Sequence, residues 1–465
     1  MENQDNELLF RIAKLVSENK ELSKQVKEYS AKNEELSHLN EKLMSYLTPD
    51  QIEKGLLEEC PSSKALKFRM TTILFADIQG FKDISESSDS QSMFDELDSI
   101  YFHFDQITEK YKIQKIKTIG DTYMCAGGVP IKNSTNPLDV VLAALEMQHY
   151  VEKLRENYGG DKSNFWQIKI GIHTGPVFAT ISGKKKISYE LKGETVNIAS
   201  RIQSTGELGK INVSVMTYEL IKEYFTFEYY GKIPVKYQGD MEMYNLKRIK
   251  LAYSVDRTGI EPNDIFMTKY CLRQFTDLQE VILDRLEKEL PVYLYYHNVK
   301  HTIDVLTQAE LIGLGEGVTD EELLLLKTAG LFHDFGHIIG YDNHEYFGTQ
   351  LAWEYLPKYG YNKQQIETIC EVIMATKLPP KPETLLQNII CDSDLDYLGR
   401  TDFIPVSNNL YRELKEQNKI GSLNDWNKLQ IKFISSHQYF TKTANSLREV
   451  NKQKQIDRIK LLIVE

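Results

Sequence analysis

Two aspartates follow stretches that predict β-strands, and together they suggest a metal site. Residues 71–77 form an apolar run that ends in Asp77. Residues 115–124 alternate polar and apolar types around Gly120 and Asp121, which predicts a β-hairpin with Asp121 at its tip. Carboxylates are the ligands that Mg²⁺ or Mn²⁺ prefers, with substrate phosphates completing the coordination. The pattern therefore predicts chemistry on a phosphate ester.

A second set of residues combines imidazoles with carboxylates. In chain order the set is His297, His301, His333, Asp334, His337 and Asp394. The first two histidines lie one helical turn apart, so their rings share one face of a helix. Such mixed nitrogen and oxygen donors suit a transition metal, such as Zn, Fe or Mn, better than Mg²⁺ alone. One buried histidine is usually a satisfied core residue, but several spaced clusters predict a metal centre.

A heptad pattern precedes both sets. Leucines and other apolar residues recur at the a and d positions between residues 8 and 47, with Asn19, Asn33 and Asn40 at a. This pattern predicts a parallel, dimeric coiled coil over residues 1–48, with a connecting helix over residues 49–66. A single solvated amphipathic helix is the alternative.

The rest of the chain divides into an α+β part and an all-α part. Residues 67–250 mix strand patterns with helical periodicity, which predicts an α+β domain. Turn-forming residues dominate the start of residues 251–275, which we interpret as a linker. Residues 276–465 show helical patterns alone, so an all-α domain is expected there.

Composition excludes some partners. The chain has 465 residues and a net charge of −11, so no basic surface for nucleic acid or an anionic membrane is expected. No apolar run approaches the roughly 18 residues that a membrane span requires. The five cysteines are scattered and the N-terminus is polar. These features predict a cytoplasmic protein with reduced thiols.

Three motifs in the α+β part resemble the class III nucleotidyl cyclases. They are FADIQGF at residues 75–81, KIKTIGDTYM at 115–124 and ETVNIASRIQSTG at 194–206. The resemblance implies a ferredoxin-like core that acts as a head-to-tail homodimer, with each active site shared by two subunits. A coiled coil upstream would fix how the two catalytic domains face each other.

The same resemblance assigns roles to individual residues. Asp77 and Asp121 match the metal-binding pair, and the backbone of Ile78 would also touch a metal ion. Asn197 would orient the ribose, and Arg201, one helical turn later, would stabilise phosphate charge in the transition state.

Two further positions bear on the base. Lys117 matches the lysine with which adenylyl cyclases bind adenine, and Glu190 stands where those enzymes usually carry Asp. This pair favours ATP over GTP, with a guanylyl cyclase as the alternative. Gln238 occupies the apparent position of a triphosphate-binding lysine, for which Lys236 could substitute. These departures leave open a signalling scaffold that binds nucleotide with weak turnover or none.

The histidine-rich part resembles the HD superfamily of metal-dependent phosphohydrolases, and its YHNxxH opening is shared with cyclic-nucleotide phosphodiesterases. By that resemblance the first metal ion is bound by His301, His333, Asp334 and Asp394. His297 would be the general acid, and His337 would assist a second metal ion or the leaving group. His344 is a weaker candidate near the site. Fusion to a cyclase suggests cyclic AMP as the substrate, with another phosphoester or a regulatory role as alternatives.

Overall fold

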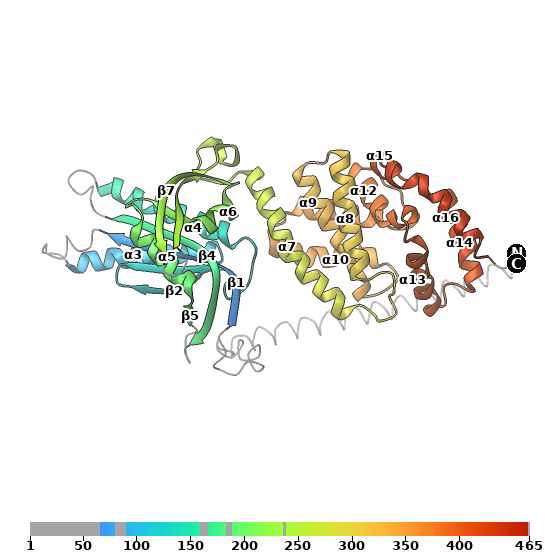
Figure 1. The fold of residues 1–465 in the computed structure, drawn as a ribbon, viewed down its shortest axis with the longest axis horizontal. Helices are drawn as coiled ribbons and strands as arrows, with labels where there is room; N and C mark the ends of the chain where they lie inside the picture. The colour runs from blue at the N-terminus through green and yellow to red at the C-terminus, as the bar shows by residue number, and fades with distance from the viewer. Residues whose placement is uncertain (1–65, 80–89, 159–165, 183–187, 236–238, 464–465) are drawn as a thin grey trace, which may run out of the picture.

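The computed structural model describes residues 66–79, 90–158, 166–182, 188–235 and 239–463. A sheet domain and a helical domain lie at opposite ends of the described part, and one long helix, α7, runs from the first into the second (Figure 1). The predicted coiled coil at residues 1–48 lies outside the described residues, as does nearly all of the connecting helix at 49–66.

The sheet domain is built on one mixed sheet with strand order β2-β3-β1-β4-β6-β8-β7, and β5 pairs with β4. The strands are β1 (Leu66–Gln79), β2 (Gln114–Ile119), β3 (Thr122–Gly127), β4 (Gln167–Ser182), β5 (Ser188–Lys192), β6 (Ile211–Ser214), β7 (Phe225–Val235) and β8 (Gly239–Ile249). The β4–β6 pair is parallel and the other pairs are antiparallel. The predicted α+β character is confirmed at this level, although β5, β6 and β8 were not predicted.

Helices cover both faces of this sheet. They are α3 (Ser90–Lys110), α4 (Asn136–Tyr158), α5 (Glu194–Thr205) and α6 (Val215–Ile221). Alternate residues of β1 belong to two different apolar clusters: Leu74 packs with residues of α3 and α4, whereas Ile73 packs with Ala199 of α5. Because both faces of β1 are buried, the strand is a continuous apolar run rather than an alternating one.

Close contact between α5 and the sheet depends on Gly171 of β4. A Cβ atom at this position would lie 2.2 Å from the backbone nitrogen of Gln203 in α5. Only glycine allows this approach, which sets the distance between α5 and the sheet.

The helical domain begins with the second half of α7 and continues to the end of the described residues. Its elements are α7 (Asp264–Glu289), α8 (Val299–Glu316), α9 (Asp320–Phe332), η4 (Phe335–Ile338), α10 (His344–Tyr355), η5 (Leu356–Tyr359), α11 (Lys363–Ala375), α12 (Leu385–Asp394), η6 (Asp396–Gly399), α13 (Phe403–Glu416), α14 (Leu423–Ser436), α15 (Lys442–Ala444), η7 (Asn445–Glu449) and α16 (Val450–Lys460). No strand occurs among the described residues after β8, so the prediction of a helical region is confirmed.

The segment predicted as a linker is largely helical. Two short 3-10 turns, η2 (Leu251–Tyr253) and η3 (Val255–Arg257), precede α7, whose first half fills residues 264–275. Phe266 belongs to the core of the sheet domain, and Leu278 and Ile282 belong to the core of the helical domain. The apolar residues of α7 therefore serve two cores, and that division obscures the helical pattern in the sequence.

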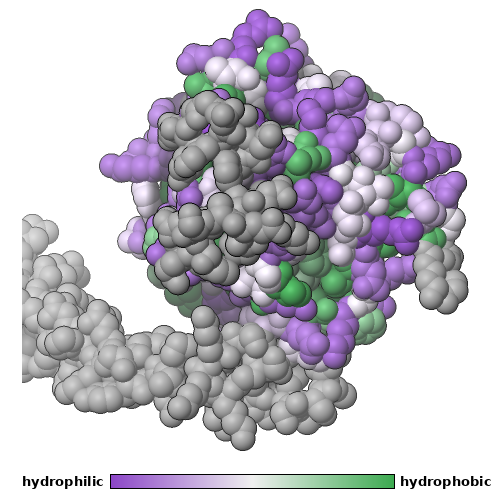
Figure 2. All heavy atoms as spheres, turned by 90° about the vertical axis from the view of Figure 1, so that its left-hand side faces the viewer, coloured by the Kyte–Doolittle hydropathy of each residue, from purple (hydrophilic) through white to green (hydrophobic). Residues whose placement is uncertain are grey.

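The face of the sheet domain that points away from the helical domain has no large continuous apolar patch among its described residues (Figure 2). Figure 2 views the end of the sheet domain, where hydrophilic side chains are interspersed with small hydrophobic groups. Within the described ranges, every helix is too short or too polar to cross a membrane.

Candidate functional site

The predicted hairpin is present and brings Asp121 to the end of β1. Strands β2 and β3 pair through Ile119 and Thr122, and Gly120 adopts a φ of +60° at the turn. Asp77 lies opposite Thr122 in the β1–β3 pair. The backbone amide of Ile78 donates a hydrogen bond to the carbonyl oxygen of Asp121 at 3.0 Å. The structure therefore places the backbone of the two predicted metal ligands side by side.

Neighbouring polar groups orient this pair. Asp77 accepts hydrogen bonds from the hydroxyl of Thr122 at 3.2 Å and from the side-chain amide of Gln79 at 3.1 Å. The hydroxyl of Tyr101 in α3 donates to the carbonyl oxygen of Gly120 at 3.1 Å. Burial, then the charges of Asp121 and Asp77, raise the pKa of Tyr101 well above its ordinary value, so the phenol keeps its proton.

Tyr101 was not singled out in the sequence. It lies on the buried face of a helix and belongs to no motif, so only the fold reveals its contact with the hairpin. The carboxylates of Asp77 and Asp121 have the donor chemistry that Mg²⁺ and Mn²⁺ prefer, so these residues fit the predicted metal pair.

The predicted base-binding residues lie on two strands that approach each other at the edge of the sheet. Lys117 is on β2 opposite Met124, and Glu190 is on β5 opposite Thr180. Both side chains are exposed, and Glu190 forms an ion pair with Lys192 at 3.2 Å. Strands β2 and β5 contact each other although they share no backbone ladder.

Asn197 and Arg201 project from the solvent face of α5. Ile198, Ala199 and Ile202 are buried on the opposite face, which leaves both polar residues exposed. Among the described residues no ion pair links Arg201 to either aspartate of the hairpin region, so the structure does not join the two halves of the predicted site. Lys236 and Gln238 lie outside the described residues.

The helical domain assembles the predicted first-metal ligands in a buried cluster. Nε2 of His301 lies 3.1 Å from Oδ1 of Asp394 and 3.3 Å from Oδ2 of Asp334. Nε2 of His333 lies 3.2 Å from Oδ2 of Asp334 and 3.8 Å from Oδ1 of Asp394. The two Nε2 atoms face each other at 3.4 Å. The ligand atoms of His301, His333 and Asp394 lie within 4.8 Å of one another, and Asp334 contacts both rings, so donors from α8 and from the ends of α9 and α12 meet as a metal ion would require.

Backbone contacts select the tautomers that metal binding needs. Nδ1 of His333 donates to the carbonyl oxygen of Gly330 at 2.9 Å, which leaves its Nε2 lone pair free. Nδ1 of His344 donates to the carbonyl oxygen of Tyr341 at 3.1 Å, and its Nε2 lies 3.5 Å from Asp334. His344, a weaker candidate from sequence, therefore faces the site directly.

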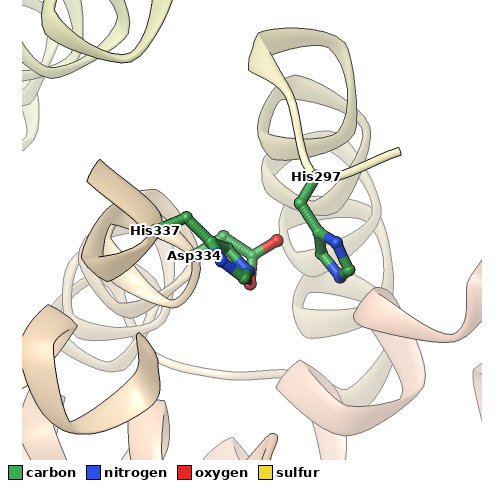
Figure 3. Close-up of side chains that lie close together, drawn as sticks. All are labelled: His297, Asp334 and His337. Carbon is green, nitrogen blue, oxygen red and sulfur yellow. Dashed lines mark ion pairs between the residues drawn. The ribbon is translucent and has the colours of Figure 1, made fainter. Parts of the chain in front are cut away.

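A second group of ligand atoms lies next to the first and shares Asp334. His297, Asp334 and His337 offer ligand atoms within 4.8 Å of one another. Figure 3 shows His297 on one side of the cluster and Asp334 and His337 on the other. His297 lies in the bend just before α8 (Val299–Glu316), so the expectation that it shares a helix with His301 was wrong. His337 is 2 % exposed, and neither of its ring nitrogens has a hydrogen-bond partner among the described residues. An unpaired, buried imidazole beside a carboxylate fits a metal ligand better than a core residue.

His297 is held by Glu413, a residue that sequence reasoning missed. Glu413 is fully buried in α13, and its carboxylate contacts Nδ1 of His297. It also accepts hydrogen bonds from the backbone amides of Tyr296 at 2.9 Å and His297 at 3.2 Å. Burial opposes ionisation of Glu413, but these bonds and the His297 ring lower its pKa overall. No sequence motif marks this contact, which spans 116 residues.

The electrostatics of the cluster match a cation site. Burial lowers the pKa of His301, but Asp334 and Asp394 outweigh burial and raise it to about 10. Burial lowers the pKa of His337 to about 2, despite the nearby Asp334, so this ring is neutral. A proton on His301 thus balances the two carboxylates, and a bound metal ion would take its place.

Together the contacts describe a cluster that could hold a metal ion and that faces an oriented imidazole. Nδ1–H of His297 donates to Glu413, so Nε2 points toward Asp334 and His337. An imidazole placed this way can deliver a proton to an oxygen atom of a molecule bound at the metal centre.

Models of known protein families match both the sheet domain and the helical domain. Residues 64–248 match the family model of the adenylate and guanylate cyclase catalytic domain, and residues 298–396 match the model of the HD domain.

Curated relatives include cyclases of both base specificities. An adenylate cyclase from Mycobacterium tuberculosis is 32 % identical over 224 residues, which cover 48 % of this chain and 50 % of that protein. The human guanylate cyclase soluble subunit beta-2 is 34 % identical over 207 residues, which cover 44 % of this chain and 33 % of that protein. The chain thus spans half or less of the length of these relatives.

One solved structure with similarity to this chain is the guanylate cyclase domain of RhGC from Catenaria anguillulae in complex with GTP. It is 29 % identical, with a TM-score of 0.36, and the match covers 40 % of this chain and 100 % of that one.

Proposed function

Because residues 64–248 are a class III nucleotidyl cyclase catalytic domain and residues 298–396 are an HD domain, we propose that this chain is an adenylyl cyclase with a cyclic-nucleotide phosphodiesterase attached. The first site would convert ATP to cyclic AMP and pyrophosphate. The second would hydrolyse cyclic AMP to AMP. One chain would then both make and remove the same messenger.

In the cyclase reaction the ribose 3′-oxygen loses its proton and forms a bond to the α-phosphorus, while the bond from that phosphorus to the pyrophosphate oxygen breaks. Asp77 and Asp121 would hold Mg²⁺ or Mn²⁺, which supplies charge neutralisation for the triphosphate. Asn197 would orient the ribose, and Arg201 would stabilise charge on the phosphates. The exposed face of α5 that carries this second pair supports a site completed by another subunit, so we propose a homodimer.

Lys117 and Glu190 support ATP as the substrate. A lysine can donate to a ring nitrogen of adenine, and a carboxylate can accept from the adenine amino group. Guanine presents a carbonyl oxygen and a protonated ring nitrogen at the same edge, which reverses this pattern. A guanylyl cyclase is the second candidate, because the curated relatives include a guanylate cyclase subunit as well as an adenylate cyclase.

The contact between Glu413 and His297 carries the proposal for the HD domain. In cyclic AMP hydrolysis a water oxygen bonds to phosphorus, the bond from phosphorus to the 3′-oxygen breaks, and the 3′-oxygen must receive a proton. His297 would give that proton from Nε2, while Glu413 stabilises the charged ring through Nδ1. His301, His333, Asp334 and Asp394 would hold the first divalent metal ion, which supplies an activated water. His337 and His344 would complete a second position.

A nucleotide time course tests both activities. Purified protein receives ATP or GTP with Mg²⁺ or Mn²⁺, and a separate reaction receives cyclic AMP directly. Asp394→Ala should accumulate cyclic AMP, whereas the wild type should convert it to AMP. Asp457→Ala, an exposed residue of α16, is the control for substitution in the same domain.

Each alternative has its own outcome. Cyclic AMP that persists equally in the wild type and Asp394→Ala would remove the phosphodiesterase assignment and keep the cyclase. Cyclic GMP formed from GTP in preference would establish the guanylyl alternative. Nucleotide binding with no cyclic product under either metal would indicate a signalling scaffold.

A further inference from the structure

In sequence, the proposed metal ligand Asp394 lies between two buried carboxylates that bind other parts of the helical domain. Asp392 is 0 % exposed and Asp396 is 3 % exposed, and each lies two residues from Asp394. Asp394 is the last residue of α12, and η6 follows it. The end of a helix is its least constrained part, so something else must fix the position of this ligand.

Asp392 binds a segment near the C-terminus. Its carboxylate accepts hydrogen bonds from the backbone amides of Phe440 at 2.9 Å and Thr441 at 2.8 Å. It also accepts one from the hydroxyl of Thr441 at 2.7 Å. Three donors on one buried carboxylate hold the last turn of α12 against this segment.

Asp396 binds the same segment a few residues later. Nε of Arg448 donates to Oδ1 of Asp396 at 2.6 Å, and Nη2 donates to Oδ2 at 3.3 Å. Gly399 permits the approach, because a Cβ atom there would lie 2.6 Å from both Cβ and the carbonyl oxygen of Arg448. Arg448 lies in the π-helical turn η7, a type of distortion that often occurs at functional sites.

The same segment also contacts α8, the helix that carries His301. Nη2 of Arg448 donates to Gln308 at 3.4 Å, and the amide of Thr443 donates to Glu316 at 2.7 Å. Residues 440–448 therefore bridge the two helices whose ligands, His301 and Asp394, lie 3.1 Å apart. These residues lie beyond the HD match, which ends at residue 396.

We propose that residues 440–448 form a clamp that places Asp394 for metal binding, with Asp392, Asp396 and Arg448 as positioning residues. The proposal rests on the metal-binding role given above to the HD domain. Metal sites tolerate little displacement of a ligand, and outer partners of ligands commonly change metal affinity 10- to 100-fold. The clamp would act on metal affinity itself rather than on folding alone.

The test measures Mn²⁺ binding to the full chain by competition with a chromophoric chelator. All variants carry Asp77→Asn and Asp121→Asn, so that the cyclase site does not contribute. Arg448→Gln and Thr441→Val are expected to weaken Mn²⁺ binding about 10- to 100-fold and about 10-fold, respectively. Arg458→Gln is the matched control, because Arg458 contacts Thr401 and Gln455 instead of the clamp. Arg448→Lys, which keeps the charge, should recover part of the affinity.

Folding and metal binding are separated by temperature. Binding is measured well below the melting temperature of each variant, with circular dichroism recording the folded state. If Arg448→Gln and Thr441→Val lower the melting temperature but bind Mn²⁺ as tightly as the chain that carries only Asp77→Asn and Asp121→Asn, the clamp is only structural and the proposal is overturned. Thr441→Val removes a single hydroxyl, so it tests the proposal even where Arg448→Gln fails to fold. Wild type that binds Mn²⁺ but cleaves no phosphoester would overturn the proposed hydrolase and leave the clamp intact.

Discussion

The buried carboxylate of Glu413 contacts Nδ1 of His297 and accepts hydrogen bonds from the backbone amides of Tyr296 and His297. The ring is therefore fixed in one orientation and one tautomer. This contact turns a histidine beside the predicted metal site into a candidate proton donor of defined direction.

Glu413→Gln should lower turnover of cyclic AMP about 10- to 100-fold, because a neutral amide cannot stabilise the charged imidazole as a carboxylate does. Cleavage of bis(p-nitrophenyl) phosphate should fall far less, since its leaving group departs without a proton. The measurement is the ratio of the two turnover numbers. Glu416→Gln, an exposed residue of the same helix, is the control. An equal loss on both esters would show that Glu413 acts on structure alone.

The sequence singled out the residues that the structure gathers into a buried cluster, whereas it gave no sign of Glu413. His301, His333, Asp334 and Asp394 belong to short motifs whose residue types and spacing are local properties of the chain. Glu413 reaches His297 across 116 residues, and its neighbours in α13 follow no motif. Such a contact depends on how helices pack, and packing is a property of the whole domain.

In the fold, too, local features could be predicted from the sequence and features that depend on packing could not. The hairpin around Gly120 could be predicted because its turn chemistry is local, and the structure has the turn at that residue. The prediction of a linker over residues 251–275 was wrong for its second half, which is the start of α7. Phe266 and Tyr270 in this part of the helix pack against the core of the sheet domain. A helix whose apolar face changes partner along its length gives a weak periodic signal.

Lys117→Glu should lower the catalytic efficiency with ATP about 10- to 100-fold, as expected when a charged hydrogen bond of about 1.5–3 kcal/mol is lost. Efficiency with GTP should not fall in parallel, so the ratio of GTP to ATP use should rise. Lys153→Glu makes the same charge change on an exposed residue of α4 and is the control. A wild type that prefers GTP, with GTP turnover unharmed in Lys117→Glu, would favour the guanylyl alternative.

His173 should make the sheet domain sensitive to acid. Burial lowers the pKa of His173 from 6.5 to about 4, and Nδ1 contacts the hydroxyl of Ser214 at 2.7 Å. Below pH 6.5 the unfolded chain binds a proton that the folded domain does not, so the free energy of unfolding falls as the pH falls toward 4. Between pH 7.5 and 5 the loss should be about 2 kcal/mol.

Urea unfolding at pH 7.5 and pH 5, followed by a signal from the sheet domain, measures this change in the free energy of unfolding. His173→Asn should remove about 2 kcal/mol of the difference between pH 7.5 and 5, whatever it costs at neutral pH. Ser214→Ala keeps the buried ring, so it should retain most of the wild-type pH dependence. An unchanged pH dependence in His173→Asn would contradict the assignment.

The interface between α7 and the sheet domain should join the two domains thermodynamically. Asp277 accepts hydrogen bonds from the amide of Ser134 at 2.9 Å and from its hydroxyl at 2.9 Å. Arg273 donates from Nε to the carbonyl oxygen of Ser134 at 2.9 Å. Replacing either residue leaves partly buried polar groups without partners, at a cost of about 1–3 kcal/mol each.

Calorimetry should therefore separate the unfolding transition of the sheet domain from that of the helical domain in a chain carrying Arg273→Met and Asp277→Ala. The cores themselves are untouched, so each domain should still unfold cooperatively. Asp284→Ala breaks only an exposed pair with Lys288 on the same helix and should leave both unfolding transitions almost unchanged. If the double variant unfolds as the wild type does, these polar contacts do not couple the domains, and the apolar contact of Phe266 with the sheet-domain core would be the next contact to change.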